Sequence, residues 1–227
     1  MNINTLVLFA PVLLFSVIAH EYAHGYAALK QGDTTALSLG RLTWNPLKHI
    51  DPFMTIVLPA VLFFTSGMIL GGAKPVPVDP RNYRNPRRGD IIVSLAGVTA
   101  NLFIALVSAG LIAVFGVLGQ VLPALADPLG ILQAMAGWSV LINIELLLFN
   151  LLPIPPLDGS HVVKYLLPPA WAVQYQRIGF FGIIILIVLL RTPFLGYWLK
   201  PGITAYHALV FHQAYLPSAG PWLPPRL

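Results

Sequence analysis

The stretch "FSVIAHEYAHGYAALK", residues 15–30, places His20, Glu21 and His24 in an apolar run close to the N-terminus. The residues before it, "TLVLFAPVLLFSVIA", lack the basic start and small-residue cleavage site of a signal peptide, so we interpret the run as a retained membrane helix. Ionisable side chains inside a membrane segment are costly, and they mark functional sites by default. The stretch therefore indicates a membrane protein whose chemistry begins on its first helix.

The composition predicts an all-α membrane protein. Of its 227 residues, 57% are hydrophobic and only 9% are charged, which is outside the range of soluble domains. Long apolar segments lie at roughly 4–29, 52–70, 91–118, 131–152 and 171–190, with a weaker one near 194–214. We therefore expect a polytopic bundle of about five to six transmembrane helices. Residues 1–215 would form one transmembrane domain, followed by a Pro-rich C-terminal tail at 216–227.

Two polar connections lie between the first three apolar segments. The stretch "LSLGRLTW", residues 37–44, alternates and predicts a short β-strand or hairpin at the membrane surface. Prolines interrupt the second connection, residues 71–90, so it should be extended. Both connections are basic, which predicts that both are cytoplasmic, yet a single crossing by 52–70 would separate them. Either that segment re-enters the membrane, or "GGAKPVPVDP" runs back through the protein, which points to the active site.

The residues "HEYAH" match the pattern H-E-x-x-H. On a helix this spacing places His20 and His24 on one face, where both imidazoles can bind one zinc ion. Glu21 lies beside the ligands and suits a general base that takes a proton from water. The chain has no cysteine, so any further metal ligand must come from His, Asp or Glu. The alternative is a pair of buried polar histidines in a helix bundle.

A catalytic zinc site usually has three protein ligands. The best third candidate is Asp158 in "FNLLPIPPLDGSHVV", where prolines stop the helix and Gly159 permits a sharp turn. Asp is also a favoured N-cap residue, so Asp158 could instead cap the next helix, and both interpretations stay open at this point. His161 could rival Asp158 as a ligand, although we interpret it as a neighbour of the site.

Other polar residues receive structural interpretations. We expect His49 to be a surface residue and Asp51 to cap the next helix. Glu145, together with Asn143, needs a buried partner, and we predict a structural role for it. Gly97 is predicted to serve close helix packing rather than catalysis.

Five motifs together resemble the site-two protease family of intramembrane zinc metalloproteases, in its compact form without a PDZ or CBS domain. They are "AHEYAHGYAALKQGD", "GRLTWNPLKHIDP", "GGAKPVPVDP", "SLAGVTANL" and "NLLPIPPLDG", and they span roughly residues 10–165. One departure is Val98, which stands in the "SLAG" element where the family commonly has proline. This change leaves the zinc-binding motifs intact.

The resemblance implies a role for each matched residue. It implies that His20, His24 and Asp158 bind one zinc ion and that Glu21 is the catalytic base. It also implies that Asn150 holds the substrate or the oxyanion near the metal. Independently, an amide at the end of a membrane helix is a fair oxyanion donor, although Asn150 could equally connect or cap helices.

The predicted function is hydrolysis of peptide bonds within or near transmembrane segments of membrane proteins. The alternative is a membrane ion or metal transporter that uses the same His, Glu and Asp cluster. Glu21 favours the hydrolase, because a transit site needs no base beside its ligands. We expect a multi-pass protein of a prokaryotic cell membrane with its active site toward the cytoplasm. Its partners would be transmembrane substrates and the lipid bilayer, not nucleic acid, and pairing with a second copy stays open.

Overall fold

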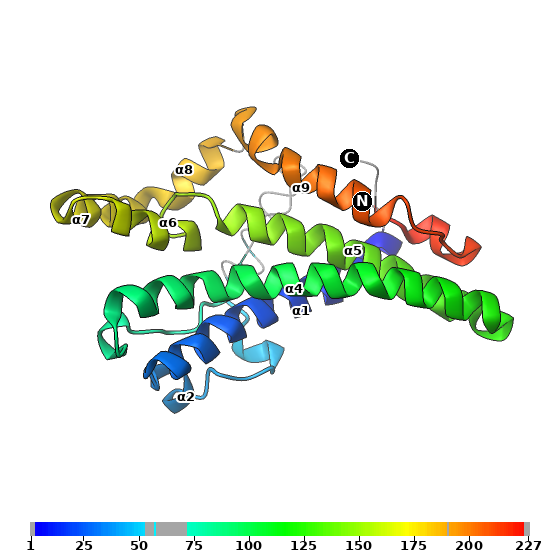
Figure 1. The fold of residues 1–227 in the computed structure, drawn as a ribbon, viewed down its shortest axis with the longest axis horizontal. Helices are drawn as coiled ribbons and strands as arrows, with labels where there is room; N and C mark the ends of the chain where they lie inside the picture. The colour runs from blue at the N-terminus through cyan, green and yellow to red at the C-terminus, as the bar shows by residue number, and fades with distance from the viewer. Residues whose placement is uncertain (1–2, 53–56, 58–71, 190, 225–227) are drawn as a thin grey trace. The chain divides into compact units, whose positions relative to one another are not determined.

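The structure is a computed structural model that describes residues 3–52, 57, 72–189 and 191–224. Every regular element within these ranges is helical (Figure 1). The α-helices are α1 (Ile3–Gln31), α2 (Thr35–Ser38), α4 (Pro86–Val121), α5 (Ala126–Asn150), α6 (Asp158–Val163), α7 (Pro169–Arg177), α8 (Gly182–Leu189) and α9 (Phe194–Val210). The 3-10 helices are η1 (Pro46–Lys48), η3 (Pro80–Asn82), η4 (Pro123–Leu125), η5 (Lys164–Leu166), η6 (Ile178–Phe181) and η7 (Pro217–Trp222).

The chain divides into two compact units. We call Val17–Gly97 the N-terminal unit, and Met1–Ser16 together with Val98–Leu227 the bundle unit. Within the described residues, three helical stretches are long and apolar enough to cross a membrane, namely Val7–Gln31, Pro86–Val121 and Pro123–Asn150. The all-α class is therefore confirmed, while the count of five to six spans stays a prediction. The segment 52–70, whose path was left open, lies almost wholly outside the described residues.

The strand predicted for residues 37–44 is not formed. The backbone N–H and hydroxyl of Thr35 both donate to the carboxylate of Asp33, and this bonding favours the helical turn of α2. Gly40 then adopts a φ of +62°, a left-handed conformation that glycine tolerates best. Local bonds from a side chain to the backbone therefore override the alternating pattern on which the strand prediction rested.

Helix α1 ends in a turn that requires glycine. Gly32 has a φ of +111° and its N–H donates to Leu29 O at 3.1 Å, while Asp33 N donates to Ala28 O at 3.0 Å. This pair of bonds is the Schellman motif, which satisfies the last carbonyls of a helix. The turn places Asp33 inside the N-terminal unit, where only 1% of it is exposed.

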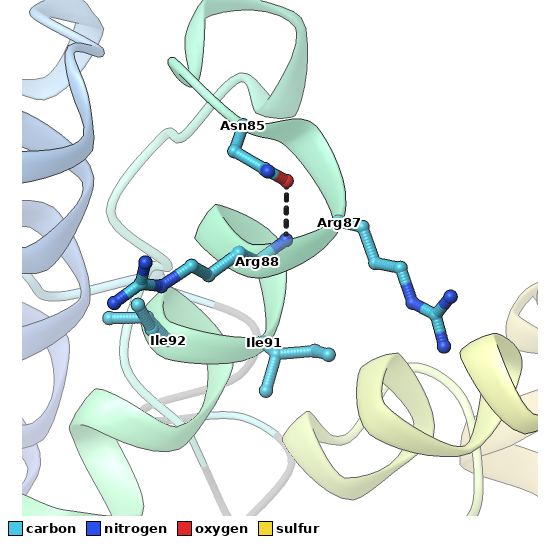
Figure 2. A pocket seen from close by; sticks show the side chains of 5 residues that line it. All are labelled: Asn85, Arg87, Arg88, Ile91 and Ile92. Carbon is cyan, nitrogen blue, oxygen red and sulfur yellow. Dashed lines mark hydrogen bonds between the residues drawn. The ribbon is translucent and has the colours of Figure 1, made fainter.

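Residues 72–79 form no helix or strand, which agrees with the first part of the prediction that 71–90 is extended, and we call them the extended segment. The prediction is wrong for the later residues, because Pro80–Asn82 is a 3-10 helix and α4 begins at Pro86. The chain then passes through η3 into α4. Asn85 caps α4, because its side-chain oxygen accepts from Arg88 N at 3.0 Å, and Pro86 occupies the first helical position. Figure 2 shows this capping bond as a dashed line.

In the bundle unit, α5 packs against α9 and against η7 (Figure 1). The apolar core is built largely from small and branched side chains of α4, α5 and α9, with Tyr206 and Ile112 fully buried. The C-terminal residues as far as Pro224 are part of this unit. Trp138 Nε1 donates to Trp222 O at 2.9 Å, and Gln133 accepts from Leu216 N at 2.9 Å. The described part of the tail therefore packs on α5.

A polar cluster lies inside the bundle unit. Asn143 is fully buried; its amide donates to Ser16 Oγ and to Ser139 O, both at 2.8 Å, and its oxygen accepts from Asn101. Ser108 Oγ donates to Ser139 Oγ at 2.8 Å. We call these five residues the Asn143 cluster. Its members satisfy one another, which is how buried polar groups are usually accommodated.

Candidate metal centre

His20 and His24 lie one helical turn apart on α1, and they face each other. Their exposed fractions are 7% and 9%, and the two Nε2 atoms are 3.0 Å apart. The rings meet edge to face, with centroids 4.6 Å apart. The expectation that both imidazoles share one helix face is therefore confirmed.

A backbone carbonyl determines which nitrogen of His24 is available. The Nδ1 atom of His24 lies 2.7 Å from Val93 O, and a carbonyl only accepts, so Nδ1–H donates and Nε2 keeps its lone pair. Two nitrogens that bind one tetrahedral zinc ion at about 2.0 Å lie about 3.3 Å apart. The observed Nε2 pair fits this arrangement, and imidazole nitrogen is a preferred zinc donor.

Gly97 of α4 lies directly against this histidine pair. A Cβ added to Gly97 would collide with His24 Nε2 and would lie 2.6 Å from Cε1 and 2.7 Å from Nδ1 of His20. Only glycine lets α4 approach the two rings so closely. The sequence predicted a packing role for Gly97, and the structure adds that it packs against the predicted metal ligands themselves.

Glu21 contacts the extended segment. Its Oε2 accepts from the backbone N–H of Val76 at 2.7 Å. Val76 is 4% exposed and packs against Gly25 on the same helix as Glu21. The Pro-rich connection therefore contacts the predicted catalytic base within the N-terminal unit, and its place at an active site stays a prediction.

Two groups hold the start of the extended segment. Arg41 Nη2 donates to Lys74 O at 3.0 Å and to Pro75 O at 3.2 Å. Lys74 N donates in turn to His49 O at 2.8 Å. The prediction that His49 is a surface residue is wrong: it is 1% exposed, and its Nε2 lies 2.8 Å from Thr43 O. The polar side chain is buried because a backbone carbonyl pairs with it.

Asp33 holds the far end of the extended segment. Its Oδ2 accepts from Asp79 N at 2.7 Å, and its Oδ1 accepts from Asn82 Nδ2 at 2.9 Å as well as from Thr35. Burial on its own would raise the pKa of Asp33, but the hydrogen bonds from Thr35, Asp79 and Asn82 together outweigh it and hold the pKa below its ordinary value. No role was predicted for Asp33 from the sequence; the signal that could have indicated one is an acidic residue directly after a helix-ending glycine.

Asp158 and Asn150 belong to the bundle unit, so their meeting with the histidines stays a prediction. Asp158 is the first residue of α6 and is half-buried, while the N-cap position belongs to Leu157. Gly159 has no left-handed φ; its lack of a side chain instead allows close contact with the carbonyls of Leu151 and Leu152. Asn150 Nδ2 donates to Leu146 O at 2.9 Å within α5.

The other polar residues considered from the sequence are His161 and Glu145, and each has its own environment in the bundle unit. His161 Nδ1 lies 3.5 Å from Lys164 Nζ, one turn along the chain. Glu145 has an exposed side chain, unlike its fully buried neighbour Asn143, so the expectation of a buried Glu145 is wrong. A change of face explains this difference, because residues two apart on a helix point in different directions.

A pocket at the start of α4 is lined by Asn85, Arg87, Arg88, Ile91 and Ile92 (Figure 2). The side chains of Arg87 and Arg88 extend to opposite sides of the helix in this view. None of the predicted catalytic or metal-binding residues lines this pocket.

Comparisons with known proteins show which family this chain resembles. The model of "Peptidase family M50" matches residues 8–190. A relative from Bacillus subtilis (strain 168), named "Putative zinc metalloprotease YwhC", is 39% identical over 193 residues, which cover 85% of this chain and 84% of the relative. A relative from Mycolicibacterium smegmatis, named "Putative zinc metalloprotease Rip2", is 31% identical over 209 residues, covering 91% of this chain and 75% of the relative. No solved structure is significantly similar to this chain.

The matched region contains the histidine pair, Glu21, the extended segment and Asp158. The resemblance to site-two proteases is therefore confirmed at the level of the family. Neither the family nor the named relatives support the alternative of an ion or metal transporter. On the extent of the match, this membrane protein belongs to peptidase family M50.

Proposed function

We propose that this chain is an intramembrane zinc metalloprotease that hydrolyses peptide bonds within or near the transmembrane segments of other membrane proteins. One observation carries the proposal. Two buried imidazoles direct their Nε2 atoms toward each other at 3.0 Å, on a helix of membrane-spanning length that also carries Glu21. Zinc is the cofactor, because the donor set fits it and the named relatives of this family are zinc metalloproteases.

His20, His24 and Asp158 form the proposed ligand set for one zinc ion. Two features support Asp158. It is half-buried at the first position of α6, and Gly159 packs that end of the helix closely against the preceding turn. A carboxylate beside two neutral imidazoles also completes a common catalytic zinc donor set and leaves one position open.

Different residues of the chain carry out different steps of the proposed hydrolysis. When bound, zinc supplies a Lewis acid that polarises the scissile carbonyl and lowers the pKa of water. Glu21 takes a proton from the attacking water and later passes it to the leaving amine. Val76 N–H holds one oxygen of Glu21, so the other oxygen is the one presented to water. Asn150 donates its amide to the developing oxyanion.

The substrate segment must be unwound before cleavage, because a transmembrane helix uses its amides in intrahelical bonds. The extended segment offers backbone to which an unwound strand can add. We further propose a multi-pass protein with about five to six spans in a prokaryotic cell membrane. The basic connections around α2 and before α4 favour an active site on the cytoplasmic side.

Glu21→Gln provides the decisive experiment. The wild-type protein and the variant are purified in detergent, their zinc is counted, and both are incubated with a panel of single-span substrates. We expect both proteins to bind zinc and only the wild type to cleave, with a loss of about 100-fold or more in the variant. Cleavage by Glu21→Gln at the wild-type rate, with zinc retained, would show that the mechanism is wrong. Transport of metal by a wild type that cleaves nothing would favour the transporter.

The third ligand is tested separately. Asp158→Ala should lose bound zinc, while Asp127→Ala, which changes an exposed aspartate at the start of α5, should keep it. Full zinc retention by Asp158→Ala would instead assign the third position to another group, with His161 the first to test. Asn150→Ala should keep zinc and lower kcat, because an oxyanion donor acts on the transition state.

A further inference from the structure

The extended segment is anchored at both ends and contacts Glu21 in its middle. Arg41 holds the carbonyls of Lys74 and Pro75 at one end, and Asp33 accepts from Asp79 N at the other. Between these anchors, Val76 N donates to Glu21 Oε2 at 2.7 Å. All of these contacts lie within the N-terminal unit.

Prolines leave the segment few ways to bond. Pro75 and Pro77 have no N–H, so Val76 carries the one backbone donor between Lys74 and Val78. Lys74 N is already used by His49 O. The Val76 donor reaches Glu21 only if the whole segment keeps its position along α1. The side chains that hold it there are Arg41 and Asp33, in addition to the backbone bond from Lys74 N to His49 O.

Asp33 has the burial and the hydrogen bonds needed to hold the extended segment in place. It is 1% exposed, and its carboxylate accepts both from its near neighbour Thr35 and from the distant Asp79–Asn82 stretch. A buried charged acceptor with several donors makes strong bonds of defined geometry. The same carboxylate follows directly after the end of α1, the helix that carries the metal ligands.

We propose that Asp33 and Arg41 are positioning residues for catalysis: they hold the extended segment so that Val76 N–H orients the carboxylate of Glu21. The inference rests on the proposed protease function. One Glu21 oxygen is fixed by Val76, so the other faces the water. Without either anchor the segment shifts, Glu21 loses its partner, and proton transfer slows although substrate binding and zinc remain.

The test uses full-length, zinc-loaded protein with Asp33→Asn, Arg41→Gln and Val76→Pro. The third variant removes the donor directly and leaves both anchors. We expect each variant to keep one zinc per chain and to lower kcat about 10- to 100-fold, with KM within about twofold, because small misplacement of a catalytic group has this size of effect. Arg84→Gln is the matched control for Arg41→Gln, since Arg84 is an exposed arginine of the same unit that lies outside the extended segment, and it should behave as wild type.

A double variant separates positioning from general destabilisation. If the anchor acts through Val76 N–H, adding Arg41→Gln to Val76→Pro should lower kcat no further, whereas independent damage would multiply. Amide hydrogen exchange of residues 72–79, measured without substrate, should accelerate in Asp33→Asn and Arg41→Gln. The inference would be overturned if the losses of kcat from Arg41→Gln and Val76→Pro multiplied in the double variant. It would also be overturned if Arg41→Gln had the kcat and the amide exchange rates of wild type. A wild type that binds zinc but cleaves no substrate would instead overturn the proposed function. The exchange measurement would still show whether Asp33 and Arg41 hold the extended segment, because it needs no substrate.

Discussion

Each unit buries a group of polar side chains among apolar helices, and the two groups are bonded in different ways. In the Asn143 cluster, amides and hydroxyls donate and accept among themselves, at distances close to 2.8 Å. In the N-terminal unit, His20 and His24 bring two nitrogens of the same kind to 3.0 Å. Both groups are about equally buried.

The chemistry of the groups explains why only one of them indicates a functional site. An amide or a hydroxyl carries both a donor and an acceptor, so the Asn143 cluster can be satisfied internally. His24, with its Nδ1–H on Val93 O, presents a lone pair toward His20. One shared proton satisfies that contact at most, whereas a divalent cation satisfies both nitrogens. Two ring nitrogens that face each other are therefore a better sign of a metal centre than polarity in a membrane segment alone.

The largest expected effect comes from removing one member of the histidine pair. His24→Ala should bind zinc more than about 100-fold more weakly than wild type, a larger loss than changes in outer partners cause, and should cleave no substrate. Chelator competition measures the affinity, and elemental analysis counts the zinc. If His24→Ala bound zinc with wild-type affinity, the histidine pair would not be a metal centre and would not differ in function from the Asn143 cluster.

Gly97→Ala tests the space around the pair without removing a ligand. The added methyl group would meet both imidazoles, so zinc affinity should fall by about 10- to 100-fold, as it does when ligand orientation is disturbed. Gly110→Ala is the matched control on the same helix, because no atom lies within 4 Å of the added Cβ. Equal zinc affinities in the two variants would contradict the close packing of α4 on the rings.

The sequence predicted those features that depend on local spacing. The i, i+4 separation of His20 and His24 determines that they share a helix face, and prolines alone exclude a helix from the extended segment. The membrane class follows in the same way from the length of apolar runs. In each case the relevant interaction lies within a few residues along the chain.

Contacts between distant residues were not predictable in this way. Gly97 is 73 positions after His24 in this numbering, and nothing in its own surroundings in the sequence indicates that it touches the rings. The Asp33 carboxylate accepts from Thr35, so a turn replaces the predicted strand, while its bond to Asp79 spans 46 positions. His49 was expected at the surface because its partner, Thr43 O, is a backbone carbonyl six positions away, which the sequence does not reveal.

Asn143→Ala is expected to affect stability and leave the metal centre unchanged. Removing the amide takes away the side chain to which Ser16 and Asn101 are each hydrogen-bonded in the buried interior. This loss should lower the free energy of unfolding by about 1–3 kcal/mol. Thermal unfolding in detergent measures the stability, and zinc per chain is counted on the same samples. A loss of zinc in this variant, with stability retained, would assign the Asn143 cluster to function after all.

The smallest expected effect concerns acid, and it separates Asp33 from the histidines. Because the pKa of Asp33 is lowered in the folded protein, its ionised carboxylate stabilises the fold above its ordinary pKa of about 3.9, and this contribution is lost as the pH falls through the lowered value. Wild type and Asp33→Asn, both with zinc removed, are compared by thermal unfolding from neutral pH down to about pH 3. The wild type should be the more stable at neutral pH, and the difference should shrink toward the acid end. Histidine protonation affects both proteins alike and cancels in the comparison, so a difference that stayed constant with pH would mean that the charge of Asp33 does not hold the extended segment.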